Sequence, residues 1–222
     1  MSDSYRQSVS DAANFFDRFA EGFDTLYDGQ RNAAMRWVDR QFRSDMFVRF
    51  ALTFEVLGDL TGSKVLDVGC GSGPYVVEAL KRGASSVTAV DPAPNMLALT
   101  RERVVRAGFS GRCEAITGAF PMVSLRPHDY AIVMGVMDYI EDAAGFLAAL
   151  HPLVQRSAAI SFPSKHWFRT PIRKLRYRLR RCPVYFYDES DIRRMVSQAG
   201  FSGVDLRKIP GAGMDFHVCV RH

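Results

Sequence analysis

The segment from Val65 to Gly73 constrains the fold most strongly. It reads Val-Leu-Asp-Val-Gly-Cys-Gly-Ser-Gly, so a short apolar run passes directly into three glycines that alternate with other residues. Residues 75–82 then follow a helical pattern. Glycines let the backbone approach a ligand closely, and the free N–H groups at the start of the next helix favour negative charge. The order of strand, glycine turn and helix therefore predicts a ligand site at the end of a buried strand.

Strand-like and helical runs alternate from this segment to residue 162. The expected strands are residues 64–68, 86–90, 113–117, 130–134 and 157–162, and the expected helices are 75–82, 96–107 and 143–150. Strands that alternate with helices of this length are joined by right-handed crossovers into a parallel sheet covered on both faces. We therefore expect an α/β fold.

The two ends of the chain have a different pattern. The tail predicts a helix over residues 189–199 and strands over 204–209 and 216–220, joined by a turn too short for anything but antiparallel pairing. The first sixty residues predict helices, with an aromatic stripe at Phe15, Phe16, Phe19 and Phe23 and a second helical pattern over residues 32–57. We expect residues 1–60 to form a helical N-terminal cap and residues 61–222 to form the main domain.

Composition limits the class of protein. The chain has 222 residues, of which 47% are hydrophobic and 24% charged, which is enough to bury a core without disulfides. It contains no apolar run long enough to span a membrane and no secretory signal, and its four cysteines include no CxxC pair. We therefore expect a cytoplasmic protein with reduced thiols and without a metal site.

The ligand class follows from the residues around the glycines. Asp91 ends the second expected strand, twenty-two residues after Gly69, and a carboxylate there can accept hydrogen bonds from a ribose diol. Pro74 stands where a dinucleotide loop has its third glycine, and no Gly-Lys-Ser/Thr sequence of a P-loop is present. Asp67, two residues before the first glycine, suits a ligand with an ammonium group and a sulfonium better than a pyrophosphate.

The sequence Leu-Asp-Val-Gly-Cys-Gly-Ser-Gly, with an acid at the end of the next strand, resembles class I S-adenosylmethionine-dependent methyltransferases. The resemblance covers residues 63–222 and implies a Rossmann-like three-layer sandwich with a seven-stranded, mostly parallel sheet whose last strand is antiparallel. It implies that the methionine part of the cofactor passes Gly69, Cys70 and Gly71, that Asp91 holds the ribose, and that Pro92 and Met96 lie beside the adenine. The expected cofactor residues are Asp67, Gly69, Cys70, Gly71, Asp91, Pro92, Met96, Ala119, Phe120 and Gly135.

One position departs from the pattern of that family. After the third strand the family often has a glycine followed by an acid that meets the adenine amino group, whereas this chain has Gly118-Ala119-Phe120. Adenine recognition is therefore left to backbone groups and to Phe120. After the fourth strand, Gly135 begins the segment that passes the methyl donor and faces the acceptor.

Three residues are candidates for the chemistry. Asp138 and Tyr139 follow the fourth expected strand, and His166 follows the fifth, at the edge where open α/β sheets bind ligands. Asp138 is equally suited to helix capping or loop packing, and Tyr139 is suited to packing against the donor. Most of the help in methyl transfer comes from positioning, and a base is needed only for a hydroxyl or a protonated amine.

The basic residues are concentrated in one segment. Residues 165–181 hold eight Lys and Arg side chains and no acid, so the remainder of the chain is net acidic although the whole carries +5. The stretch from Arg169 to Arg181 is either a solvated helix with one face on the body of the protein, or a lid that attracts an acidic acceptor or contacts an anionic membrane surface. An extended basic stripe and an Asn/Asp-Pro-Pro-Tyr/Phe sequence are both absent, which argues against DNA as a partner.

A narrower resemblance concerns the acceptor. Phe162-Pro163-Ser164-Lys165, the basic segment and the run from Tyr187 to Ile192 are loosely similar to magnesium-protoporphyrin O-methyltransferases, which esterify a propionate. We expect an enzyme that methylates a small acceptor, more often at oxygen, with its oligomeric state open. The alternatives are a non-catalytic protein of the same fold that binds the cofactor or a protein partner, and a nicotinamide oxidoreductase, which Pro74 and Asp67 disfavour.

Overall fold

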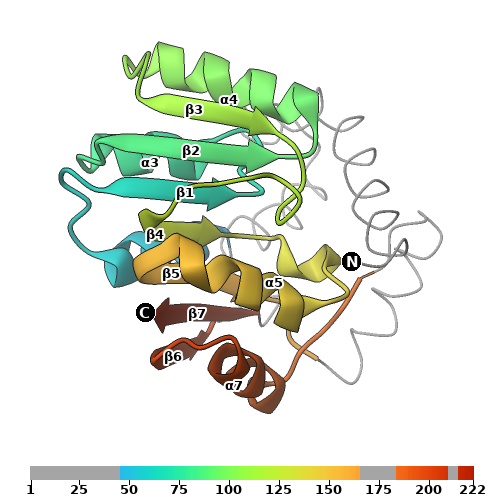
Figure 1. Cartoon of the computed structure of the whole chain (residues 1–222). Coiled ribbons are helices and arrows are strands. Elements are labelled where there is room, and N and C mark those ends of the chain that lie inside the picture. Colours follow the sequence, from blue (N-terminus) through green and yellow to red (C-terminus); the bar gives the residue numbers. More distant parts are fainter. Residues whose placement is uncertain (1–45, 166–183, 210–214) are drawn as a thin grey trace, which may run out of the picture.

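The structure is a computed structural model that describes residues 46–165, 184–209 and 215–222. A seven-stranded sheet with the strand order β3-β2-β1-β4-β5-β7-β6 forms its centre (Figure 1). The strands are β1 (Lys64–Val68), β2 (Ser86–Asp91), β3 (Cys113–Thr117), β4 (His128–Val133), β5 (Val154–Phe162), β6 (Gly203–Lys208) and β7 (Phe216–Arg221). The helices are α3 (Pro74–Lys81), α4 (Pro94–Arg106), α5 (Ala143–Leu150) and α7 (Glu189–Gln198), with the short helices η1 (Met137–Tyr139) and η2 (His151–Leu153).

The pairing of the strands confirms the expected sheet. Strands β1 to β5 pair in parallel, whereas β7 lies between β5 and β6 and runs antiparallel to both. In Figure 1 the arrow of β7 accordingly points against those of β1 and β2. Chain order reverses between β1 and β4, so the carboxyl ends of these strands form a topological switch point, where ligands bind in open sheets.

Two hydrophobic clusters cover the sheet and make it the middle layer of three. Side chains alternate along β1, so Leu66 and Val68 pack toward α5 and α7, while Val65 packs toward α3 and α4. All the expected strands and helices of the described ranges are present, with ends that differ by a few residues. The largest difference is at β5, which begins at Val154 rather than at Ser157 because it continues directly from η2.

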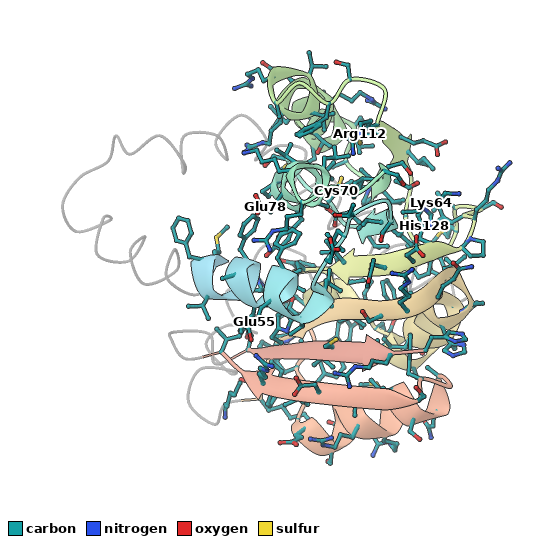
Figure 2. All side chains as sticks on the ribbon, turned by 90° about the vertical axis from the view of Figure 1, so that its left-hand side faces the viewer. Glu55, Lys64, Cys70, Glu78, Arg112 and His128 are labelled. Atoms are coloured by element: carbon teal, nitrogen blue, oxygen red, sulfur yellow. The ribbon has the colours of Figure 1, made fainter. Side chains whose placement is uncertain are left out.

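The predicted N-terminal cap is described only in part. Residues 46–57 are helical, in agreement with the second helical pattern, whereas the aromatic stripe at Phe15, Phe16, Phe19 and Phe23 lies outside the described residues. The helix of residues 46–57 lies across the sheet between α3, which carries Glu78, and the end of the sheet formed by β7 and β6 (Figure 2). No helix within the described ranges combines the length and the apolar character that crossing a membrane requires.

Aromatic contacts hold this helix on the domain. Phe54 is 1% exposed, and its ring lies 5.1 Å from that of Phe50 and 6.0 Å from that of Tyr75 on α3. The guanidinium of Arg82 covers the Phe54 ring at 4.8 Å. The helix therefore shares a hydrophobic core with the sheet rather than forming a separate unit.

We expect Phe54→Ala to lower the free energy of unfolding by about 3–5 kcal/mol, because it opens a cavity between the helix and α3. Phe47→Ala is the matched control, since Phe47 lies on the same helix but is 67% exposed, and its effect should stay below about 0.5 kcal/mol. Urea unfolding followed by circular dichroism measures both. Equal small losses in the two variants would contradict the shared core.

Candidate active site

A cavity of about 320 Å³ opens at the carboxyl ends of β1, β2 and β4. The glycine turn, the ends of these strands, the loop after β3, the segment after β4 and the helix of residues 46–57 all contribute to it. Its lining consists of Met46, Arg49, Val68, Gly69, Cys70, Gly71, Ser72, Pro74, Tyr75, Val90, Asp91, Pro92, Met96, Gly118, Ala119, Phe120, Met134, Gly135, Val136, Tyr139, Ile140 and Phe146. A volume of this size suits a small-molecule ligand.

The glycine turn requires its glycines. Gly69, Gly71 and Gly73 have φ angles of 70°, 54° and 81°, a region that glycine occupies at no steric cost. A Cβ atom at Gly69 would overlap the side chain of Val136, and one at Gly73 would lie 2.8 Å from Thr100 Oγ1. At Gly69 the turn passes too close to the segment after β4 for a side chain, and at Gly73 it passes too close to α4, whereas Gly71 is favoured by its φ angle alone.

Asp91 holds the turn in place. Its Oδ2 accepts a hydrogen bond of 2.9 Å from the Gly71 N–H, and its Oδ1 accepts one of 2.9 Å from the Ala93 N–H. The Gly69 N–H donates to the Val90 carbonyl at 2.7 Å. Asp91 lines the cavity, and a carboxylate can accept further hydrogen bonds from hydroxyl groups there.

Burial favours the protonated form of the neighbouring acid, Asp67. Asp67 is 1% exposed and is not among the lining residues, and its Oδ2 has no hydrogen-bond partner within the described part of the chain. Loss of solvation, and then the charge of Asp91, raise the pKa of Asp67 to about 8. Burial and both acids also raise the pKa of the Cys70 thiol. At neutral pH the protonated form of Asp67 therefore prevails, and its contact with a ligand stays a prediction.

The end of the cavity beside β3 is apolar. Met96 is buried, and the rings of Phe120 and Phe146 meet edge to face with centroids 4.8 Å apart. Ala119 lines the cavity at the position where the family that the sequence resembles often has an acid. A planar heterocycle would therefore meet apolar walls and backbone groups at this end.

The segment after β4 forms the opposite wall. Gly135, Tyr139 and Ile140 line the cavity, and the Gly135 N–H donates to Ser161 Oγ at 2.8 Å. The hydroxyl of Tyr187 donates to the Ile140 carbonyl at 2.9 Å, and the Asp138 carbonyl accepts from the Tyr185 N–H at 2.9 Å. The segment that returns at residues 184–188 thus holds this wall in place.

The structure brings most of the predicted site residues together. Gly69, Cys70, Gly71, Asp91, Pro92, Met96, Ala119, Phe120, Gly135 and Tyr139 all line one cavity. Asp138 does not line it, and the N-cap of α5 is formed by Asp142 rather than by Asp138, because Asp142 Oδ1 accepts from the Gly145 N–H at 2.8 Å. His166 lies outside the described residues. No cluster of three or more side chains suited to a metal ion occurs in the parts of the chain that the structure describes.

Sequence reasoning missed several lining residues. Met46, Tyr75 and Phe146 have no sequence signal beyond apolar periodicity, which marks core positions equally well. Arg49 is different, because its place in the helix before the first strand makes it an expected partner for the methionine carboxylate from the sequence alone.

Comparison with known proteins agrees with this geometry. A family profile described as "Methyltransferase domain" matches residues 65–156. The "Ubiquinone biosynthesis O-methyltransferase" of Neisseria meningitidis is 27% identical over 173 residues, which are 72% of this chain and 70% of that protein. The protein of the same name from Methylocella silvestris is 33% identical over 101 residues, 43% of this chain and 37% of that protein.

Residues 65–156 thus match the methyltransferase domain family. The fold matches that of magnesium protoporphyrin IX methyltransferase from Synechocystis with bound S-adenosylhomocysteine, with a TM-score of 0.77 and 22% identity over 97% of this chain and 99% of the other. The same neighbour has also been solved with bound S-adenosylmethionine. The residues around the cavity fit it, because the turn has no side chains at its glycines and Asp91 offers acceptors to a ribose.

We expect Asp91→Ala to weaken binding of S-adenosylhomocysteine by several-fold to a hundredfold, corresponding to about 1–3 kcal/mol for the loss of an acceptor to a buried polar group. Isothermal titration calorimetry measures the dissociation constant. Asp59→Ala is the control, because Asp59 is exposed and accepts from the nearby Thr61 N–H. An unchanged affinity in a folded Asp91 variant would remove this residue from the site.

The stability of the wild-type protein should depend on the protonation of Asp67. Its folded pKa of about 8 lies above the ordinary value of 3.8, so the folded state binds the proton more tightly and loses stability as the pH rises from about 4 to about 8. Asp67→Asn is neutral throughout and should lack this loss. Urea unfolding at pH 5 and pH 8 measures it, and a variant that loses as much stability as the wild type would contradict the assignment.

Proposed function

We propose that this protein is an S-adenosylmethionine-dependent methyltransferase that acts on a small organic acceptor, and that the accepting atom is an oxygen of a carboxylate or a hydroxyl group. One observation carries the proposal: a single cavity of about 320 Å³ joins the glycine turn and Asp91 to the segment at Gly135–Ile140. A donor held by the turn would present its methyl group along this wall. The small volume favours a small acceptor over a folded macromolecule.

The relatives support oxygen as the accepting atom. The Neisseria and Methylocella proteins are named O-methyltransferases of ubiquinone biosynthesis, and the structural neighbour is named a magnesium protoporphyrin IX methyltransferase. Their acceptors belong to those proteins, and the aligned segment covers as little as 37% of the first of them. For this chain the proposal is limited to the chemical class of the acceptor.

Charge near the acceptor wall favours an acidic acceptor. Residues 166–183 lie outside the described part, but the residues that flank them are held beside this wall: Lys165 donates its N–H to the Tyr187 carbonyl at 3.0 Å, and Tyr187 binds the Ile140 carbonyl. Lys165 itself is paired with Asp188 and Asp191. The sequence between these two anchors holds seven Lys and Arg residues, and this positive charge supports an acceptor that carries a carboxylate or belongs to an anionic surface.

The chain's own residues would act mainly by positioning. S-adenosylmethionine, when bound, supplies a methyl group on a sulfonium, and the acceptor oxygen forms the new bond as the bond to sulfur breaks. The glycine turn and Asp91 hold the donor end, and Tyr139 and Ile140 shape the space through which the acceptor approaches. A carboxylate acceptor is ionised at pH 7 and needs no base, whereas a hydroxyl would need Asp138 or His166 to take its proton.

The proposal is tested by incubating the protein with S-adenosylmethionine and a panel of small carboxylic acids and phenols, and measuring S-adenosylhomocysteine formation together with the methylated product. Esters or aryl ethers support it. Tight binding of the donor without turnover on any acceptor would favour the non-catalytic alternative, and products methylated only at nitrogen or carbon would overturn the assignment to oxygen.

We expect Asp138→Asn and His166→Ala to lower the turnover number on a hydroxyl acceptor by about 10²-fold or more, the range for general base catalysis, with little change in donor affinity. His151→Ala is the control histidine, because His151 precedes the amino-terminal end of β5, opposite to the end that borders the cavity, and stacks on His222. If both variants keep the full rate, neither residue is the base.

A further inference from the structure

The helix of residues 46–57 contacts the last strand of the sheet through a buried polar pair. His217 on β7 and Thr53 on the helix are both 0% exposed. The distance between His217 Nε2 and Thr53 Oγ1 is 3.2 Å. Both residues lie outside the matched domain of residues 65–156, and His217 lies on a strand that the sequence marks only as apolar.

The direction of these hydrogen bonds follows from counting hydrogens. The Thr53 hydroxyl donates its single hydrogen to the Arg49 carbonyl at 2.8 Å. It can then only accept from His217, so the hydrogen of the imidazole lies on Nε2. His217 Nδ1 is buried and has no hydrogen-bond partner in the described residues. The result is a directed chain from His217 through Thr53 to the backbone of Arg49.

Burial, together with two nearby cations, keeps this histidine neutral. Burial, and then the cations Arg207 and Arg49, lower the pKa of His217 to about 4, while Asp205 and Glu55 act in the opposite direction. At neutral pH the imidazole therefore stays in a single protonation state. The hydrogen bond to Thr53 keeps one direction over the range in which the enzyme can be assayed.

Arg49 is the residue that this chain of hydrogen bonds reaches. It lies one helical turn before Thr53 and lines the cavity at the side of the helix. The Nε of its guanidinium is buried without a hydrogen-bond partner in the described residues. A buried, charged donor that lacks a partner is costly, and an anionic group in the cavity would satisfy it.

We propose that His217 is a positioning residue: through Thr53 it fixes the helical turn that presents Arg49 to the cavity, so that Arg49 binds the carboxylate of the methionine part of the donor. This inference rests on the proposed function, because it requires S-adenosylmethionine in the cavity. His217 itself touches neither donor nor acceptor. Its effect on affinity is confined to the carboxylate-bearing end of the ligand.

The test compares two ligands that differ at that end. S-adenosylhomocysteine carries the amino-acid carboxylate, whereas 5′-methylthioadenosine has the same nucleoside and sulfur but no amino acid. We expect His217→Leu and Thr53→Val to weaken binding of S-adenosylhomocysteine about tenfold and to leave the affinity for 5′-methylthioadenosine within about twofold. Arg49→Gln should give the same pattern, and calorimetry measures all the dissociation constants.

Rescue and control variants separate positioning from stability. His217→Gln keeps an N–H donor near the position of Nε2 and should restore most of the affinity for S-adenosylhomocysteine. Glu55→Gln removes the 2.7 Å ion pair between the same helix and Arg207 and should not change the ratio of the two affinities. Thr53→Val conserves shape, so it tests the proposal even if His217→Leu does not fold.

The outcomes are distinguishable. If the wild type binds both ligands and the His217 and Thr53 variants weaken both equally, or neither, the positioning role is wrong while the proposed function stands. If the wild type binds neither ligand, the proposed function fails and this inference fails with it. A selective loss that glutamine at position 217 restores supports the proposal, because a purely structural defect would affect both ligands.

Discussion

The hydrogen bonds of the Asp91 carboxylate are the interaction on which the site depends. One carboxylate oxygen accepts from Gly71 and the other from Ala93, so the end of β2 is tied to the glycine turn after β1 and to the start of α4. This arrangement requires glycines at a turn that passes within contact of Val136 and Thr100. The shape of the cavity thus follows from a few backbone N–H groups and one acid, and its other walls are built around them.

The sequence was sufficient for the strands, the helices and this turn, because their signals are local. Alternation of strands and helices predicts that β1 to β5 form a parallel sheet, and the place of Asp91 at the end of the second strand predicts that this acid lies at the ligand site. It was not sufficient for the walls supplied by Phe146 and Tyr75, because apolar residues on helices look alike whether they face a core or a cavity. Separating them requires the positions of elements that are distant in sequence.

His217 illustrates the same limit for polar residues. It stands in the strand sequence Phe-His-Val-Cys-Val, where alternation indicates only which face of the sheet its side chain takes. Its partner Thr53 is 164 positions away, on a helix that precedes the whole sheet. The insertion of β7 between β5 and β6 brings the two together. The role of such a buried polar residue depends on a partner that is distant in sequence, so no local sequence pattern predicts it.

The charges of the cavity explain why it suits a zwitterionic nucleoside better than a pyrophosphate. Burial raises the pKa of Asp67 to about 8, so its protonated form prevails at neutral pH, while the Asp91 carboxyl group lines the cavity beside the turn and Arg49 lines it from the helix. A ligand with two phosphate groups at the turn would meet the Asp91 carboxyl group and find no cation among the loop residues. A ligand with a sulfonium, an ammonium and a carboxylate can direct its positive groups toward the acid and its carboxylate toward Arg49. The separation of Asp91 and Arg49 in an otherwise apolar cavity therefore favours a zwitterionic ligand over a pyrophosphate. This preference depends on the burial of Asp67 as well as on which residues line the cavity.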